Sequence, residues 1–576
     1  MKRFYKKACC LLFASLFVLA LMPAAALAAP LGDVREANLI KITSAQAFKK
    51  GTLENLVVGE TAGDGALRLG DGAAEGTYIS EEIAVPAFEY LVASWNADTP
   101  PGTYVEVFGR AYVDKKEAWS SWLSWGKWSP YIERASTNDE DELAMVDVDT
   151  FTVLGTSGET ANRFQFKVVL ASTESGVSPV LRQVAASMKN TLKDQGIGVY
   201  HQGVELPEKV LLDTPAYSQM VRDRAIADSI CSPTTMTMLL NDRGEDLFPE
   251  EVALNEYDFE YEGFGNWSYT VAAAGAYGYD AYCMYADFDF LREQLALGYS
   301  VGISVKYSNK ENGSNPYLQN GAISSTSGHL ISIVGYETID GVDYFYSNDS
   351  AAGTDELCVL RKYKAKQLDY AWSNRLAYIV GDKEQGAGFA APKRVDAALS
   401  YVEGSENEYA LAANGSAVAL SKSFLSGKLR QLGNGSIFVI RKTDAALPVF
   451  NDVTVCTTAN LDIEYPVKMS DAGNIILDPG KVLKDDPEGA IVDLTVYVVF
   501  NNGVTYVAPL TLTKARAVPG ATAAPAAQTS AATAAPAKET EAPAKPGGIA
   551  VYIAIAAAVV VAGTAFLILT RGKKRG

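Results

Sequence analysis

Two apolar segments, one near each end of the 576-residue chain, limit most strongly how the chain can fold. At the start, four basic residues precede an apolar run from Ala8 to Met22, and the small residues of Ala26-Leu27-Ala28 follow it. This order of basic, apolar and small residues is typical of a secretory signal peptide. We therefore predict a signal peptide over residues 1–28, cleaved near Ala28, and a body that folds outside the cytoplasm.

The second apolar segment, Ile549 to Thr570, has no charged residue over its 22 positions. As a helix it would be about 33 Å long, which is enough to cross a bilayer. The basic residues of the 571–576 tail indicate the cytoplasmic side. Residues 515–548, rich in Ala, Pro and Thr, read as a linker without a core. We expect a single-pass protein of the cell membrane with an extracellular body and a cytoplasmic tail.

Charge excludes some functions for that body. The net charge of the chain is −18, and subtracting the eight positive charges of the two ends leaves −26 on the rest. A surface this acidic repels nucleic acid phosphates and anionic lipid headgroups. We therefore expect no nucleic acid partner.

Three globular regions lie between the ends. Residues 31–195 contain alternating stretches such as Thr103–Phe108, which predict a β-sandwich. Residues 385–514 are also β-rich, and Ile491–Phe500 followed by Asn502-Gly503 predicts a hairpin. Residues 196–384 mix helical and strand patterns, as an α+β domain does. If the region after it is only a spacer, this central region should fold by itself.

Cys231 is a candidate nucleophile in the central region. Pro233 suits a first helical turn, and a mostly apolar stretch continues to Gly244, which should end the helix. A cysteine at a helix amino terminus has a lowered pKa, because the helix dipole stabilises the thiolate. The same pattern also fits an ordinary buried cysteine.

The chain has two histidines, His201 and His329, which nearly excludes a histidine-based metal centre. We expect no metal and no cofactor. His329 follows a glycine and opens an apolar strand, and a second strand ends in Asn348-Asp349. Cysteine, histidine and a carboxylate or amide together form the set that a thiol hydrolase needs. Neighbouring strand residues point to opposite faces, so only one of Asn348 and Asp349 can reach the histidine.

Residues 210–380 resemble the papain-fold cysteine peptidases similar to the bacteriocin-processing, double-glycine-leader peptidases, in an extracellular form. The matching stretches are Tyr217-Ser218-Gln219, Cys231–Thr235, Gly265-Asn266-Trp267, Ala272–Gly275, Leu295–Gly298, Val301–Val305, Gly328-His329, Gly335-Tyr336 and Asn348-Asp349. The resemblance implies that Cys231 is the nucleophile and His329 the general base and acid. It also implies that Asp349 orients the histidine and that Gln219 donates to the oxyanion beside the Cys231 N–H.

The chain departs from that family at several positions. Ile230 stands where glycine is common, and Ser350 stands where proline usually follows the aspartate. The spacing between Gln219 and Cys231 is also longer than expected. The chain has no phosphate-binding Gly-Lys-Ser/Thr loop, so coupled export does not follow from the resemblance.

The amino-terminal region resembles the jelly-roll-like sandwiches that accompany secreted hydrolases. It holds five of the seven tryptophans: Trp95, Trp119, Trp122, Trp125 and Trp128. Exposed tryptophans could stack on a glycan or another surface ligand, whereas tryptophans inside a sandwich usually belong to its core. After signal cleavage the chain keeps Cys231, Cys283, Cys358 and Cys456. The sequence does not decide whether Cys283 and Cys358 form a disulfide.

Together these patterns predict a membrane-anchored, extracellular cysteine peptidase of a bacterium, which hydrolyses peptide bonds in a peptide or protein substrate through a Cys231 acyl-enzyme. Two alternatives stay open. A transpeptidase or acyltransferase would use the same Cys231 and His329 with an amine in place of water. A non-catalytic surface binding protein would retain a peptidase-like domain without activity.

Overall fold

The structure is a computed structural model, and it describes residues 32–59, 65–192, 196–222, 226–384, 394–405, 407–413, 416–417, 450–457, 464–465, 467–470, 474–500 and 505–514. The predicted signal peptide, the 515–548 linker, the 549–570 helix and the 571–576 tail lie outside these residues. Within the described ranges, no helix has the length and apolar character needed to span a membrane.

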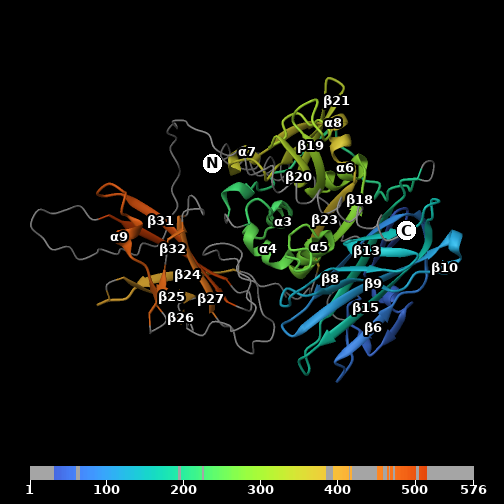
Figure 1. Ribbon diagram of the computed structural model, residues 1–576, viewed down its shortest axis with the longest axis horizontal. Coiled ribbons are helices and arrows are strands. Elements are labelled where there is room, and N and C mark those ends of the chain that lie inside the picture. Colours follow the sequence, from blue (N-terminus) through green and yellow to red (C-terminus); the bar gives the residue numbers. More distant parts are fainter. Residues whose placement is uncertain are drawn as a thin grey trace, which may run out of the picture.

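The amino-terminal region is a sandwich of two antiparallel sheets, as its alternating pattern predicts (Figure 1). Along β9 (Thr103–Val113), buried residues alternate with half-buried ones, because successive side chains point to opposite faces of the sheet. The first sheet has the order β1-β2-β16-β8-β14-β13-β12, with β5 also beside β16 and β4 beside β5. Its strands are β1 (Val34–Glu36), β2 (Leu39–Ile42), β4 (Leu56–Val58), β5 (Leu67–Leu69), β8 (Tyr90–Asp98), β12 (Thr137–Glu140), β13 (Ala144–Val148), β14 (Thr150–Val153) and β16 (Val180–Lys189).

The second sheet has the order β10-β9-β15-β6-β3, with β11 beside β9 and β7 beside β15. Its other strands are β3 (Thr52–Glu54), β6 (Glu75–Ile79), β7 (Ile83–Phe88), β10 (Ala118–Trp119), β11 (Leu123–Trp128) and β15 (Ala161–Ser172), and a short helix, α2 (Ala45–Phe48), joins β2 to β3.

The tryptophans of the sandwich divide into two groups. Trp95, Trp125 and Trp128 are completely buried and belong to the core. Trp119 and Trp122 are half-buried, and the Arg110 guanidinium lies over both rings, 4.8 and 4.5 Å from their centroids. Each of these two half-buried rings is therefore already in contact with a cation.

The central region is one antiparallel sheet with helices on both faces, in the order β18-β23-β19-β20-β21-β22 with β17 beside β20. The strands are β17 (Lys209–Leu211), β18 (Tyr279–Tyr285), β19 (Val301–Ser308), β20 (Ser325–Ile339), β21 (Val342–Asn348), β22 (Arg361–Lys364) and β23 (Leu376–Lys383). The helices are the 3-10 turn η2 (Gln219–Val221), α3 (Cys231–Asp242), α4 (Pro249–Glu256), α5 (Trp267–Ala276), α6 (Phe288–Ala296), α7 (Asp355–Cys358) and α8 (Ala365–Ala371).

Alternation along β18 shows how the two faces of this sheet are used. Cys283 and Tyr285 belong to the hydrophobic core that contains α3 and α5, whereas Tyr282 and Met284 belong to the core that contains α6 and α8. Because side chains on one strand alternate between faces, a single strand serves both cores. The sheet is thus buried on both sides.

The sandwich and the central region contribute to both of these cores. Helix α5 and strand β18 pack against β8 and β16 of the sandwich, and each of the two apolar clusters includes residues of both regions. Polar groups also join them: Asn96 Nδ2 donates to the Tyr279 carbonyl at 3.1 Å, and Gln183 Nε2 donates to the Ala281 carbonyl at 3.0 Å. The central region therefore buries helix α5 and strand β18 against the sandwich.

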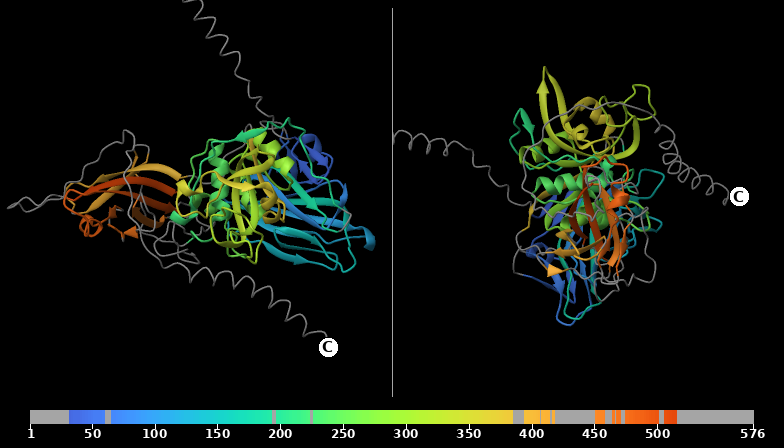
Figure 2. Two further views of the ribbon diagram at one scale, coloured as in Figure 1. Left: turned by 90° about the horizontal axis from the view of Figure 1, so that it is seen from above. Right: turned by 90° about the vertical axis from the view of Figure 1, so that its left-hand side faces the viewer.

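The carboxy-terminal region is a further sheet with its own core, which lies beside the other two regions in Figure 2. The strand order is β28-β27-β31-β32-β24-β25-β30-β29, with β26 beside β25. The elements are β24 (Arg394–Tyr401), β25 (Glu408–Ala413), β26 (Ser416–Ala417), β27 (Phe450–Thr457), β28 (Glu464–Tyr465), β29 (Lys468–Met469), β30 (Ile475–Ile476), α9 (Pro479–Val482), β31 (Ile491–Phe500) and β32 (Thr505–Thr513). The antiparallel pairing of β31 with β32 confirms the predicted hairpin strand.

Candidate active site

Cys231 is the first residue of α3, as the sequence predicts. Ile230 precedes it and makes no side-chain capping hydrogen bond to the first turn of the helix. Helix α3 packs against β20, the strand that carries His329. The helix thus directs its positive end and its cysteine toward the histidine.

His329 and Asp349 form a buried pair. Nε2 of His329 lies 2.7 Å from Oδ1 of Asp349, and the two residues are 3% and 0% exposed. His329 lies on β20 opposite Val305, and Asp349 follows directly on the last residue of the neighbouring strand β21. Because Nε2 faces the carboxylate, Nδ1 is the ring nitrogen left for the thiol.

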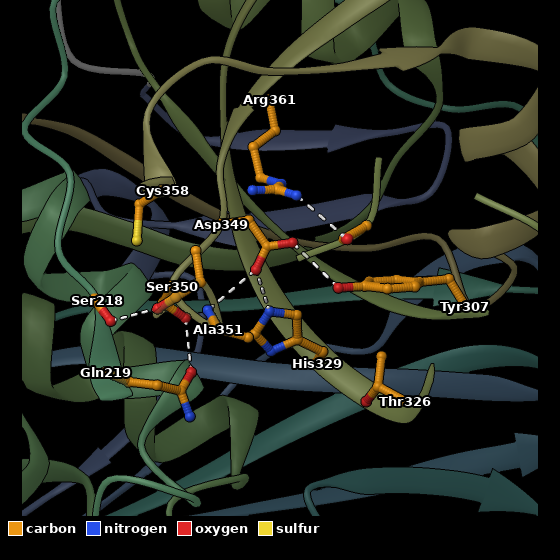
Figure 3. A network of polar contacts seen from close by, with 12 residues as sticks. Ser218, Gln219, Tyr307, Thr326, His329, Asp349, Ser350, Ala351, Cys358 and Arg361 are labelled. Carbon is orange, nitrogen blue, oxygen red and sulfur yellow. Dashed lines mark hydrogen bonds and ion pairs between the residues drawn. The ribbon is translucent and has the colours of Figure 1, made fainter. Parts of the chain in front are cut away.

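Three further donors hold the Asp349 carboxylate, as Figure 3 shows in part. The Tyr307 hydroxyl donates to Oδ2 at 3.2 Å and the Tyr363 hydroxyl at 2.9 Å, while the Ala351 N–H donates to Oδ1 at 3.1 Å. Burial raises the pKa of Asp349, but the His329 charge and these hydrogen bonds outweigh it, and the pKa falls below its ordinary value. The carboxylate is therefore ionised and fixed in orientation.

Cys231 and His329 stabilise each other's charged forms. Burial raises the pKa of the Cys231 thiol, but the hydrogen bond and the charge of His329, with the Leu330 and Ser232 N–H groups, bring it below its ordinary value. For His329, burial lowers the pKa, but Asp349 and then Cys231 outweigh it and raise the pKa to about 10. Both shifts thus favour a thiolate beside an imidazolium.

Asn348 does not face the histidine. Its Nδ2 donates to the Thr214 carbonyl at 2.9 Å, and its Oδ1 accepts from the Leu360 N–H at 3.0 Å. The structure thus brings Asp349, and not its neighbour, to His329. Asn348 instead joins two loops that surround the end of β21.

Gln219 begins the 3-10 turn η2, and its side chain is 4% exposed. Nε2 donates to the Ala227 carbonyl at 2.8 Å, four residues before Cys231, and Oε1 accepts from the Ser350 hydroxyl at 2.8 Å. This contact joins the Gln219 turn to the residue that follows Asp349. The Gln219 amide thus joins the η2 turn to Ala227, which lies shortly before Cys231 in the chain.

A buried carboxyl group, Glu256, also lies near Cys231. It is completely buried at the end of α4, where the Thr270 hydroxyl donates to its Oε2 at 3.1 Å and its Oε1 has no hydrogen-bond partner among the described residues. Burial raises its pKa well above the ordinary value, and the thiolate raises it further. Burial thus favours the neutral form of this carboxyl group, which adds less negative charge beside Cys231 than an ionised one would.

Sequence reasoning missed Tyr307, Tyr363 and Glu256. Tyrosine is common in this chain, with 30 residues, and the two phenols come from different strands. No motif or spacing distinguishes them from core tyrosines. Only the strand order β19-β20-β21-β22 brings them to one carboxylate.

The other histidine and the other two cysteines of the central region have partners of their own. His201 faces Asp287 and Glu293, with N–O distances of 3.3 and 3.5 Å. Cys283 and Cys358 are buried free thiols, so the bridge that the sequence left open is not formed in this structure. Among the residues that the structure describes, no three His, Cys, Asp or Glu side chains gather in a way that could hold a metal ion.

Comparisons with known proteins agree with this geometry. Residues 38–189 match the family model described as "Peptidase C39 N-terminal domain", and residues 211–378 match the one described as "Peptidase_C39 like family". The second match confirms the predicted resemblance to a family of cysteine peptidases and supports a cysteine peptidase-like domain in the chain. No curated protein matches the chain.

Two solved structures are similar to part of the chain. Digestive procathepsin L 3 of the Tenebrio molitor larval midgut is 12% identical, with 32% of this chain and 72% of that chain covered and a TM-score of 0.24. Xylellain, a cysteine protease from Xylella fastidiosa, is 16% identical, with 31% of this chain and 87% of that chain covered and a TM-score of 0.20.

Proposed function

Since residues 211–378 form a C39-like peptidase domain, we propose that this protein is an active cysteine peptidase that cleaves peptide bonds through a covalent intermediate on Cys231. One observation carries the proposal. His329 contacts a fixed carboxylate through Nε2. Its imidazole also forms a hydrogen bond with the thiol of Cys231. This is the arrangement that lets one imidazole move a proton between a thiol and a leaving group.

In the first half of the reaction, Sγ of the Cys231 thiolate forms a bond to the carbonyl carbon of the substrate, and the C=O electron pair moves to the oxygen. The Cys231 N–H and the free N–H of Gln219 Nε2 donate to this oxyanion. The oxyanion then re-forms the C=O bond, and the C–N bond breaks. His329 gives its proton to the leaving nitrogen, so an amine departs and a thioester remains.

In the second half, His329 removes a proton from a water molecule, whose oxygen attacks the thioester carbon. The second tetrahedral intermediate expels the Cys231 thiolate, and the acyl group leaves as a carboxylic acid. His329 keeps the proton, which restores the ion pair. Asp349 stays ionised throughout and stabilises the imidazolium.

We extend the proposal to location and partners on the basis of sequence alone. The segment Ile549 to Thr570 would anchor the protein in the cell membrane, and the signal peptide would place its body on the extracellular side. The substrate is then a peptide or protein outside the cell. The sandwich remains a candidate for contact with a glycan or another surface ligand.

The test uses the full-length protein in detergent and a peptide library, with mass spectrometric analysis of the products. Cys231→Ala and His329→Ala should each abolish cleavage without unfolding the protein. His201→Ala is the matched control, because it removes the other histidine of the chain and should leave cleavage intact. Cleavage that survives Cys231→Ala would overturn the proposal. Addition of small amines shows whether water or an amine resolves the thioester.

A further inference from the structure

The side-chain amide of Gln219 is held at both of its ends. Nε2 donates to the Ala227 carbonyl at 2.8 Å, and Oε1 accepts from the Ser350 hydroxyl at 2.8 Å. The backbones of Gln219 and Ser350 are joined as well, since the Gln219 N–H donates to the Ser350 carbonyl at 2.9 Å. Figure 3 shows Ser350 between Gln219 and the His329–Asp349 pair.

These contacts fix which way the amide points. If the amide were turned by 180°, Oε1 would face the Ala227 carbonyl, and two acceptors would lie against each other. The Ser350 hydroxyl then supplies the donor that the buried Oε1 needs in the observed orientation. One N–H of Nε2 donates to Ala227, and the second has no partner among the residues that the structure describes, so it stays available for an oxyanion.

We propose that Ser350 is a positioning residue for the oxyanion donor, because its hydroxyl holds the Gln219 amide with Nε2 toward the reacting carbonyl. The proposal rests on the proposed function of Cys231 and extends it. Asp349 and Ser350 are neighbours in the chain, so one bend after β21 orients both the histidine and the oxyanion donor.

The proposal also accounts for a departure from the family pattern. Proline is expected after the aspartate, whereas this chain has Ser350. Proline has no hydroxyl and cannot hold Oε1 of Gln219. The serine is completely buried, and its hydroxyl hydrogen bond is to Gln219.

Two reactions of Cys231 separate this role from a general structural role. A peptide aldehyde forms a hemithioacetal whose oxygen takes the oxyanion position, so its affinity depends on the oxyanion donors. Iodoacetamide alkylates the thiolate at an sp³ carbon and creates no oxyanion, so its rate depends on Cys231, His329 and Asp349 alone. The full-length protein would be titrated with a small panel of peptide aldehydes and, separately, labelled with iodoacetamide.

Ser350→Ala should weaken aldehyde binding roughly tenfold, less than the loss of a whole oxyanion donor. Its alkylation rate and the pH midpoint of alkylation should stay within about twofold of the unsubstituted protein. In a Gln219→Ala background, Ser350→Ala should have no further effect, because the residue acts through the amide. Ser347→Ala is the matched control: Ser347 is buried on β21, its hydroxyl has no hydrogen-bond partner among the described residues, and aldehyde binding should not change.

Three results for Ser350→Ala would overturn the proposal. The first is aldehyde binding as tight as that of the unsubstituted protein. The second is a fall in the alkylation rate as large as the fall in aldehyde affinity. The third is a loss of aldehyde affinity that is as large in the Gln219→Ala background as in the otherwise unsubstituted protein. An unsubstituted protein that is alkylated at Cys231 but binds no aldehyde would instead contradict the peptidase function, and this inference with it.

Discussion

Lys41 Nζ lies 2.7 Å from Oδ2 of Asp280, and the side chains are only 1% and 5% exposed. Lys41 belongs to β2 of the sandwich, whereas Asp280 lies on β18 of the central region. The two residues are separated by 239 positions in the chain. A buried ion pair thus crosses the boundary between the two regions and lies beside their common apolar core.

Removal of one partner of this pair should be costly. Lys41→Met leaves the Asp280 charge buried without compensation, and we expect a loss of about 3–5 kcal/mol in the free energy of unfolding. Urea unfolding followed by tryptophan fluorescence measures it. Arg163→Met is the control, because its pair with Glu82 is largely exposed and should contribute less than about 1 kcal/mol. Equal effects of the two substitutions would contradict this account.

Truncation tests the shared core directly. A fragment of residues 196–384 should be insoluble or aggregate, because removal of the sandwich exposes the apolar faces of α5 and β18. A longer fragment, residues 32–384, should be soluble and monomeric by size-exclusion chromatography. Soluble, reactive protein from the shorter fragment would show that the central region folds independently.

The rate of Cys231 alkylation should depend on pH in a characteristic way. Its pKa is lowered by His329, so thiolate is present at pH values where an ordinary thiol is protonated. Burial raises the pKa of Cys358 to about 12 and that of Cys283 well above its ordinary value. At about pH 6, Cys231 should therefore react first by peptide mapping, and the imidazolium should persist until the pH approaches about 10. Labelling of Cys358 before Cys231 would contradict the assignment.

Asp349 and Asn348 should differ in what their substitution costs. Asp349→Asn removes the charge that stabilises the imidazolium, and turnover should fall by on the order of 10²–10⁴ while the fold is retained. Asn348→Ala should instead lower the free energy of unfolding by about 1–3 kcal/mol, because it leaves the Thr214 carbonyl and the Leu360 N–H without their partner. Steady-state kinetics and urea unfolding of both variants separate the two effects. The reverse ranking would move the orienting role to Asn348.

Local patterns in the sequence were sufficient for much of the fold. The alternation in Thr103–Phe108 predicts a strand, and Pro233 and Gly244 mark the two ends of the helix that carries Cys231. These signals work because they depend on neighbouring residues alone. The order of cysteine, histidine and aspartate along the chain was likewise enough to indicate a thiol site.

Other features depend on how distant strands meet. Strand alternation could not choose between Asn348 and Asp349, because the choice depends on which of the two side chains lies on the same face of the sheet as His329. The phenols of Tyr307 and Tyr363 reach Asp349 only through the strand order. The packing of the sandwich against β18 could not be predicted from the sequence either. Asn96 and Gln183 look like ordinary polar strand residues, and their role is clear only once β18 is placed beside them.

The polar contacts between the sandwich and β18 also have a consequence for inheritance. Asn96, Gln183 and Lys41 each satisfy a backbone or side-chain group of Tyr279, Ala281 or Asp280. A recombination event with its breakpoint between the two regions would combine a sandwich and a catalytic sheet whose buried groups no longer match. We therefore expect the two regions to occur together in related chains. We also expect substitutions at these contacts to covary.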